Sequence, residues 1–375
     1  MRIANPIPFV LVCLTAASAV AQDSIKDSFT TTNGRRIRGV EITEMTASSI
    51  KFLRDGNQDE LPAALLASVT WFQPPEQLAL AHAAMRKREF DNAANLFEEV
   101  ASKTDRDVLK VDAAFFSAKA LARSAEEDPG RASMAVDKLK SFLSEHGENL
   151  RAAEAQLELG RAQLLAGDAV GAEQTLTELS SKVAAQGLDS LWDIRAKYEI
   201  AEAQLAQGKF AEARTSFRRA KTTASTVVAA SADPVPQVEA YIAKSIVGEG
   251  ETFIAEKKYD DAIRYFDRLQ RDDNPLVAAA AKAGKGESLF LKAEADGKQD
   301  GLREAQIVLA EAILDDVASG STTAKAMFYS GRVIVALGAE RESSDFMARA
   351  NDYFATVIAH YGDTAWAAKA KEFVK

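Results

Sequence analysis

The chain contains few of the residues on which several common kinds of site depend. Its 375 residues include one cysteine, three histidines, nine prolines and 20 glycines. The histidines are too few and too scattered for most metal sites. The scarcity of proline and glycine argues against a loop-rich all-β protein. Hydrophobic residues at 47% and charged residues at 27% exclude a disordered or collagen-like chain.

The first 21 residues have the three-part pattern of a secretory signal peptide. Met1-Arg2 is a short positive start, residues 6–20 are almost free of polar groups, and Ala19-Val20-Ala21 is a small-x-small cleavage site. The apolar stretch is about 15 residues long, whereas a membrane-spanning helix needs ~20. We therefore predict cleavage after Ala21 and a periplasmic or secreted mature chain without a membrane span. An uncleaved anchor is the alternative.

The single cysteine lies inside this leader. Cys13 follows Val12 and precedes Leu14, which continues the apolar run, so the small residue that a lipoprotein signal places before its acylated cysteine is missing. Cleavage after Ala21 leaves a mature chain without cysteine. Such a chain has no disulfide, zinc thiolate or thiol nucleophile, so its fold must be stabilised by the core alone.

Residues 22–73 are predicted to form a small β module. Asn33-Gly34 is a hairpin signal, because both residues tolerate a positive φ. Five short strands are expected near residues 29–32, 37–42, 49–54, 61–62 and 69–72. So many short strands in so few residues indicate a strongly bent sheet or a barrel. Pro74-Pro75 marks the boundary to a helical region over residues 74–375.

The motif Thr-x-Asn-Gly-Arg-x-Ile-x-Gly at residues 31–39, followed by Leu61-Pro62 and Val69-Thr70-Trp71-Phe72, resembles Sm-like or SH3-like barrels of exported bacterial proteins. The loop residues of the RNA-binding members are absent. The net charge of −9 also argues against nucleic acid as a partner, because such binding needs a basic face.

Alanine-rich segments with helical periodicity fill residues 76–375, and their spacing repeats. Residues 198–220 show the pattern most fully. Ala201 is a small residue on a first helix, Gly208 is in a turn, and Phe210, Ala213 and Phe217 follow on a second helix. Small residues let paired helices cross closely, and aromatic residues fill the space between hairpins. This pattern resembles the tetratricopeptide repeat.

Seven copies of the pattern are found, and they predict an α-solenoid of about seven helical hairpins. Their first-helix small residues are Ala81, Ala118, Gly160, Ala201, Gly250, Gly286 and Gly331. Residues 142–149 and 358–370 resemble the repeat endings of an envelope branch of this superfamily, which includes the Tol-Pal coordinator. That resemblance implies an exported protein-interaction scaffold in the bacterial envelope.

No catalytic or metal-binding motif is apparent, so we predict neither an enzyme nor a cofactor or metal site. Gly284-Lys285-Gly286 is a partial match to a phosphate loop, but it lacks the first glycine and the Ser or Thr after the lysine. It also lies within a helical repeat instead of following a strand. Helix packing is the better interpretation.

The concave side of the solenoid is the predicted partner-binding site, because first helices line the inner surface of such arrays. The candidate groove residues are Lys119, Arg161, Arg195, Tyr198, Lys244 and Arg332. A basic and apolar groove of this kind is suited to a peptide segment or an envelope protein. A cell-wall or polysaccharide-binding module and a helical-repeat enzyme remain as alternatives, and the last helix, with Trp366, caps the array or docks a second copy.

Overall fold

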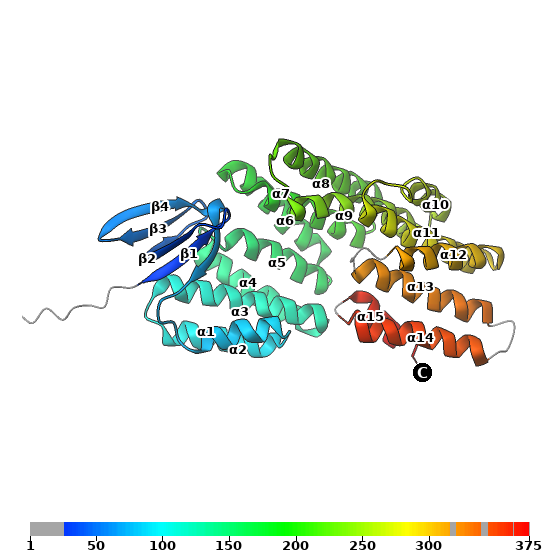
Figure 1. Ribbon diagram of the computed structural model, residues 1–375, viewed down its shortest axis with the longest axis horizontal. Helices are drawn as coiled ribbons and strands as arrows, with labels where there is room; N and C mark the ends of the chain where they lie inside the picture. Colours follow the sequence, from blue (N-terminus) through cyan, green and yellow to red (C-terminus); the bar gives the residue numbers. More distant parts are fainter. Residues whose placement is uncertain (1–25, 316–319, 339–343, 363, 375) are drawn as a thin grey trace, which may run out of the picture.

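The computed structural model describes residues 26–315, 320–338, 344–362 and 364–374. Within them the chain forms a small β-sheet followed by seven helical hairpins and a final helix, as Figure 1 shows. The first helices of the hairpins are α1 (Gln77–Arg86), α3 (Asp107–Glu127), α5 (Ala152–Leu165), α7 (Ser190–Ala206), α9 (Pro236–Ala255), α11 (Pro275–Asp296) and α13 (Gly320–Gly338). The second helices are α2 (Phe90–Lys103), α4 (Ala132–His146), α6 (Ala169–Gln186), α8 (Phe210–Ala230), α10 (Tyr259–Asp267), α12 (Asp300–Leu314) and α14 (Ser344–His360), and α15 (Ala365–Lys371) follows them.

Small residues on the first helices set the close crossing within each hairpin. A Cβ atom added at Gly160 would lie 2.6 Å from the Leu176 side chain of the second helix. At Gly286 the same atom would lie 2.5 Å from Leu309. The predicted hairpin pattern is confirmed. The glycine at 286, part of the partial phosphate-loop match, therefore serves helix packing.

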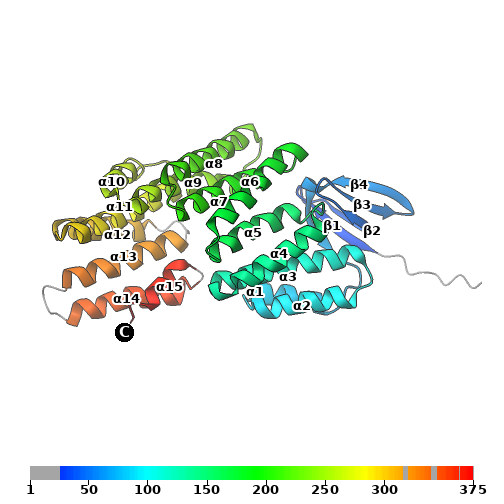
Figure 2. The same ribbon diagram turned by 180° about the vertical axis from the view of Figure 1, so that it is seen from behind.

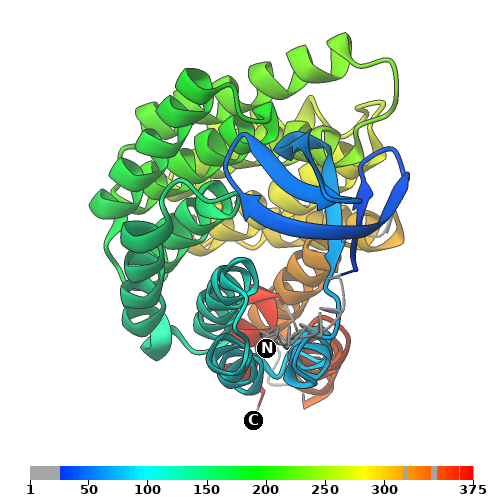
Figure 3. The same ribbon diagram turned by 90° about the vertical axis from the view of Figure 1, so that its left-hand side faces the viewer.

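The hairpins stack side by side and follow a curved path. Figure 2 shows this row from behind, and Figure 3 shows the helices arranged around a common centre with the sheet across one end. Consecutive first helices contact one another along most of the array. Elements on the inside of a curve approach most closely, so the first helices form the concave wall, as expected for such solenoids.

The five strands form one antiparallel sheet in the order β4-β3-β2-β1-β5. They are β1 (Asp27–Thr31), β2 (Arg36–Met45), β3 (Ser49–Arg54), β4 (Asn57–Pro62) and β5 (Leu66–Thr70). Their positions agree with the five strands expected from the sequence. The sheet is open, because β4 and β5 are its two edges, so the closed barrel implied by the Sm-like resemblance is not formed.

The sheet shares a hydrophobic core with the first hairpin. Phe29, Ile42 and Phe52 from the sheet belong to the same buried cluster as Ala81 and Phe97 from α1 and α2. This shared core explains why the sheet need not close on itself. Its apolar face is already covered by the helices.

A buried ion pair and a backbone bridge also fix the sheet on the solenoid. The Asp27 carboxylate is fully buried and accepts hydrogen bonds from Arg106 Nη1 at 2.8 Å and Nη2 at 2.5 Å. Arg106 lies in the turn before α3. On the other side, Thr46 forms a β-bridge with Asn149, in the turn before α5. The sheet is thus held at two consecutive hairpins.

The predicted signal peptide, its cleavage site after Ala21 and Cys13 lie outside the described residues. Among the residues that the structure does describe, no helix is long and apolar enough to cross a membrane.

Candidate functional site

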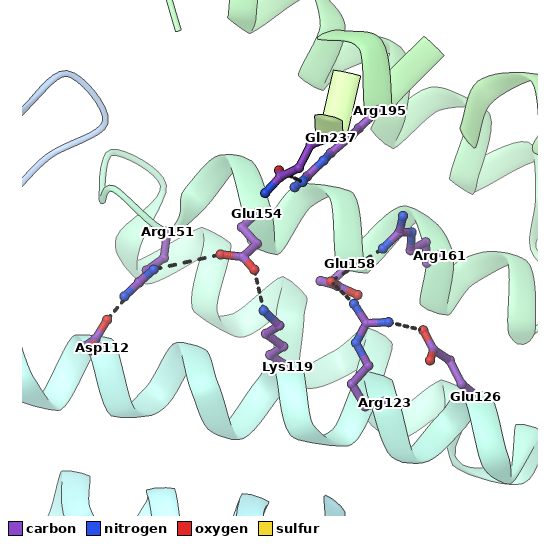
Figure 4. A network of polar contacts seen from close by, with 10 residues as sticks. All are labelled: Asp112, Lys119, Arg123, Glu126, Arg151, Glu154, Glu158, Arg161, Arg195 and Gln237. Carbon is purple, nitrogen blue, oxygen red and sulfur yellow. Dashed lines mark hydrogen bonds and ion pairs between the residues drawn. The ribbon is translucent and has the colours of Figure 1, made fainter. Parts of the chain in front are cut away.

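Ion pairs join consecutive first helices on the concave wall, and Figure 4 shows three of them: Asp112–Arg151, Lys119–Glu154 and Arg123–Glu158. Each joins a cation on a first helix, or in the case of Arg151 on the residue just before α5, to a carboxylate on a neighbouring first helix, and we call this series the inter-repeat ladder. Its members are Asp112–Arg151 at 2.8 Å, Lys119–Glu154 at 2.5 Å, Arg123–Glu158 at 2.8 Å, Arg161–Glu199 at 2.6 Å and Glu294–Arg332 at 2.9 Å. Asp112, Glu158 and Glu199 are buried, so these pairs contribute to the packing of one repeat on the next.

The ladder is interrupted at α9, because within the described residues no ion pair joins α9 to α7 or to α11. Arg195 on α7 meets Gln237 on α9, with Arg195 Nη2 donating to Gln237 Oε1 at 3.2 Å (Figure 4). Arg195 also lies 5.0 Å from the centre of the Trp192 ring, and its buried Nε has no hydrogen-bond partner. Within the described part of the chain, Arg195 forms no ion pair.

A cavity of about 470 Å³ opens on the concave side next to this interruption. Its walls are first helices, joined by the final helix. The lining residues are Tyr198 and Glu202 of α7; Ala240, Ala243, Lys244, Val247, Gly248 and Glu251 of α9; Leu276, Ala280 and Ala283 of α11; Ser321, Thr322 and Lys325 of α13; and Trp366 of α15. Alanine and other apolar side chains predominate, with a few charged groups among them. This composition is typical of ligand sites.

Two charged groups of the cavity have strongly shifted pKa values. Burial raises the pKa of Glu202 to about 7, with a further contribution from the nearby carboxylates of Glu199 and Glu251. Lys325 is buried between Glu251, at 2.8 Å, and Glu287, and these two carboxylates outweigh burial and raise its pKa. The cavity thus holds a fixed cluster of one ammonium and two carboxylates on α13, α9 and α11, and α7 carries a carboxyl group that is partly protonated near neutral pH.

Lys244 differs from the other cations of the wall. Its side chain is exposed, and its Nζ lies 5.0 Å from the centre of the Tyr241 ring. Loss of water around the ammonium in the groove lowers its pKa, and Arg161 and Arg195 lower it further, whereas Glu199 and Glu202 raise it. No carboxylate within the described ranges forms an ion pair with Lys244.

The six residues predicted for the groove all lie on first helices, in separate environments. Lys119 and Arg161 are members of the ladder, and Arg332 pairs with Glu294. Tyr198 and Lys244 line the cavity, and Arg195 lies beside Gln237. The structure therefore brings Arg195, Tyr198 and Lys244 to one region, whereas three of the predicted cations are already paired within the chain.

Two features of the groove are not apparent from the sequence. Trp366 reaches the cavity from α15, so the final helix contributes to the concave wall. Its ring lies 5.6 Å from that of Phe328 on α13. The ladder is the other feature. In the sequence, each of its pairs is a cation and a carboxylate 35 to 39 residues apart. Such a pair can be recognised only once the register of the repeats is known.

The histidines lie at scattered positions in the helices. His82 on α1 is packed at 5.1 Å from the Phe97 ring, and burial lowers its pKa. His146 and His360 are the last residues of α4 and α14. In the portion that the structure describes, no group of three or more His, Cys, Asp or Glu side chains is placed to hold a metal ion.

Comparisons with known proteins agree with this architecture. Two segments match family profiles described as tetratricopeptide repeat, at residues 78–110 and 195–223. The first covers α1, α2 and the start of α3, and the second covers most of the hairpin of α7 and α8. The chain carries tetratricopeptide repeats. A search of curated proteins finds no match.

Solved structures of tetratricopeptide-repeat proteins are among those that match this chain. A signal transduction ATPase with a tetratricopeptide repeat sensor from Pyrococcus horikoshii is 13% identical, with a TM-score of 0.51 over 79% of this chain and 44% of that one. A tetratricopeptide repeat protein from Parabacteroides merdae is 14% identical, with a TM-score of 0.49 over 80% and 96% of the two chains. The quorum sensor NprR from B. thuringiensis is 12% identical, with a TM-score of 0.46 over 79% and 86%. At these identities the likeness concerns the fold alone.

Proposed function

We propose that the protein is an interaction scaffold that binds an extended peptide segment of a partner protein in its concave groove. The observation that carries this proposal is the cavity of about 470 Å³ between four first helices and Trp366. Tetratricopeptide-repeat folds are typically non-catalytic scaffolds, and their concave surface is built for extended ligands.

The lining supports a peptide more than a small polar ligand. Ala240, Ala243 and Ala280 leave room along the wall, and Val247 and Leu276 offer apolar contacts. Burial of apolar side chains in such a site contributes about 25 cal/mol per Å² of area removed from water. The polar groups at its rim would orient the peptide backbone and set specificity.

We further propose that the scaffold acts outside the cytoplasm, in the bacterial envelope. The leader pattern at residues 1–21 supports this location. Cell fractionation followed by mass spectrometry of the purified protein tests it. A periplasmic or secreted chain beginning at Gln22 is expected, and a cytoplasmic chain beginning at Met1 contradicts it.

A peptide-display selection tests the binding site directly. Residues 22–375 select binders from a library of linear 12-residue peptides, and affinities of the selected peptides are measured by fluorescence anisotropy. The variant Ala280→Trp fills the cavity from α11 and should weaken binding at least about tenfold, since the peptide loses its apolar contacts.

Ala229→Trp is the matched control, because Ala229 is exposed on α8, a second helix. It should bind the selected peptides with unchanged affinity. Equal loss in both variants, equal retention in both, or failure of the wild type to select any peptide would each refute the groove as a peptide site.

A further inference from the structure

The interruption of the inter-repeat ladder defines a place where a carboxylate is missing. In the steps from α3 to α5, from α5 to α7 and from α11 to α13, a cation meets a carboxylate across consecutive first helices, as Arg161 meets Glu199. At the corresponding step from α7 to α9, the partner of Arg195 is the neutral amide of Gln237. An amide oxygen accepts a hydrogen bond but leaves the guanidinium charge uncompensated, and bonds to charged acceptors are roughly twice as strong.

A second cation lies close to this position. Lys244 is two turns of α9 beyond Gln237, at the edge of the cavity, and has no carboxylate partner within the described chain. Arg195 contacts Gln237 at 3.2 Å, and Lys244 lies on the same face of α9 two turns further on, so the two cations are neighbours along the groove. Glu199 and Glu202 also act on Lys244, but within the described residues neither Lys244 nor Arg195 forms an ion pair, and two cations without an ion-pair partner favour an anion between them.

Local structure holds both cations in place and adds to the positive potential. The Arg195 guanidinium lies over the Trp192 ring, and the Lys244 ammonium lies over the Tyr241 ring. Gln237 is the second residue of the 20-residue helix α9, whose N-terminal end carries a partial positive charge. The site is therefore preorganised for a negative group.

The site also lies on the path that an extended peptide would follow. Trp192, Arg195 and Glu202 are spaced along α7. Trp192 lines a second cavity of about 370 Å³ beside the sheet, and Glu202 lines the first cavity. At 1.5 Å per residue, Trp192 and Glu202 are about 15 Å apart along the helix. An extended chain covers that distance in about five residues, so a peptide entering both cavities passes Arg195.

We propose that an acidic side chain of the bound segment enters the gap between Arg195 and Lys244 and completes the inter-repeat ladder. This inference rests on the proposed peptide-binding function and specifies the partner as an acidic segment. We favour a side-chain carboxylate of the peptide over its C-terminal carboxylate. The carboxylates in the other steps of the ladder are also Asp or Glu side chains within a continuous segment of chain.

The test is a positional scan of peptides with both ends blocked. Acetylated and amidated 12-residue peptides with random sequences are selected on residues 22–375, and the enrichment of Asp and Glu is measured at each position. Strong enrichment at one position is expected. Replacing that residue by Gln or Asn should weaken binding about tenfold or more, and high salt should reduce the difference.

Variants of the chain locate the effect. Arg195→Gln and Lys244→Gln should each remove the acidic preference, whereas Arg219→Gln, at an exposed position of α8, should keep it. Gln237→Glu supplies the missing carboxylate within the chain. It should fold normally and bind the acidic peptides about tenfold more weakly, while still binding their Gln counterparts.

The outcomes separate this inference from the function on which it rests. Peptides that bind in the groove without acidic enrichment, or whose preference survives Arg195→Gln and Lys244→Gln, overturn the acidic site and leave the scaffold intact. Binding that requires a free C-terminal carboxylate overturns the side-chain assignment. Failure to select any peptide overturns both proposals.

Discussion

At the scale of single residues, Glu202 is the group whose protonation depends most on the fold. Burial in the groove, together with Glu199 and Glu251, raises its pKa to about 7. A carboxyl group with a raised pKa binds more protons in the folded state than in the unfolded state. The stability of the fold therefore falls as pH rises from about 4.5, the unfolded pKa of this group, to about 7. Above that range the folded protein carries the full free-energy cost of a partly buried Glu202 carboxylate.

Glu202→Gln should remove this cost. Because the side chain is only partly exposed, we expect the variant to be about 1–2 kcal/mol more stable than the wild type at pH 8.5. The two proteins should converge in stability below about pH 4.5. Urea denaturation at a series of pH values measures the difference, and a constant difference across this range would contradict the raised pKa.

The paired cations show a limit of prediction from residue types. Lys119, Arg161 and Arg332 were expected in the groove, and each lies on a first helix, but each is paired with a carboxylate of a neighbouring repeat. Those partners are 35 to 38 residues away, so the pairing depends on how consecutive hairpins stack. Sequence periodicity places a residue on a helix face, but it does not identify what lies opposite.

At the scale of helices and strands, close crossing governs each hairpin. Gly160→Val places a branched side chain where Leu176 already lies, so it should lower the free energy of unfolding by about 1–3 kcal/mol. Ala184→Val, on the exposed side of α6, is the control and should cost less than about 1 kcal/mol. Chemical denaturation of both variants measures this difference.

A double-mutant cycle shows whether the crossing itself is responsible. Combining Gly160→Val with Leu176→Ala should recover part of the loss, because the smaller residue makes room for valine. Strict additivity of the two substitutions would contradict the close contact.

A buried ion pair contributes to the attachment of the sheet, beside the shared core and the Thr46–Asn149 bridge. Arg106→Ala leaves the carboxylate of Asp27 buried without its partner, which typically costs about 3–5 kcal/mol. Arg88→Ala removes the exposed pair with Glu127 and should cost at most about 1 kcal/mol. Hydrogen exchange in strands β1 to β5 should accelerate only in the first variant, and equal acceleration in both would show that this pair does not hold the sheet.

The strands also show what local signals leave undetermined. Asn33-Gly34 correctly marks the first hairpin, and the five segments form strands as expected. Closure into a barrel depends instead on whether β4 meets β5. In the structure the apolar side chains of the sheet join a core shared with the helices, with β2 against α3, and no short strand motif specifies this packing.

At the scale of the whole molecule, the repeats determine the architecture and the curvature creates the groove. The seven hairpins can be predicted from the sequence, because each needs small residues where its two helices cross and aromatic residues between hairpins, and these recur along the chain. The groove is harder to predict. It forms where α7, α9, α11 and α13 converge with α15, and Trp366, 168 residues after Tyr198 in the chain, closes one side.

The central claim is that the concave groove binds the partner. The most direct measurement is hydrogen–deuterium exchange, followed by mass spectrometry, of residues 22–375 with and without a selected peptide. We predict slower exchange in α7, α9, α11, α13 and α15, with α8, α10 and α12 unchanged. Protection confined to the second helices, or to the outer edge of the sheet at β4, would contradict the claim and place the partner elsewhere.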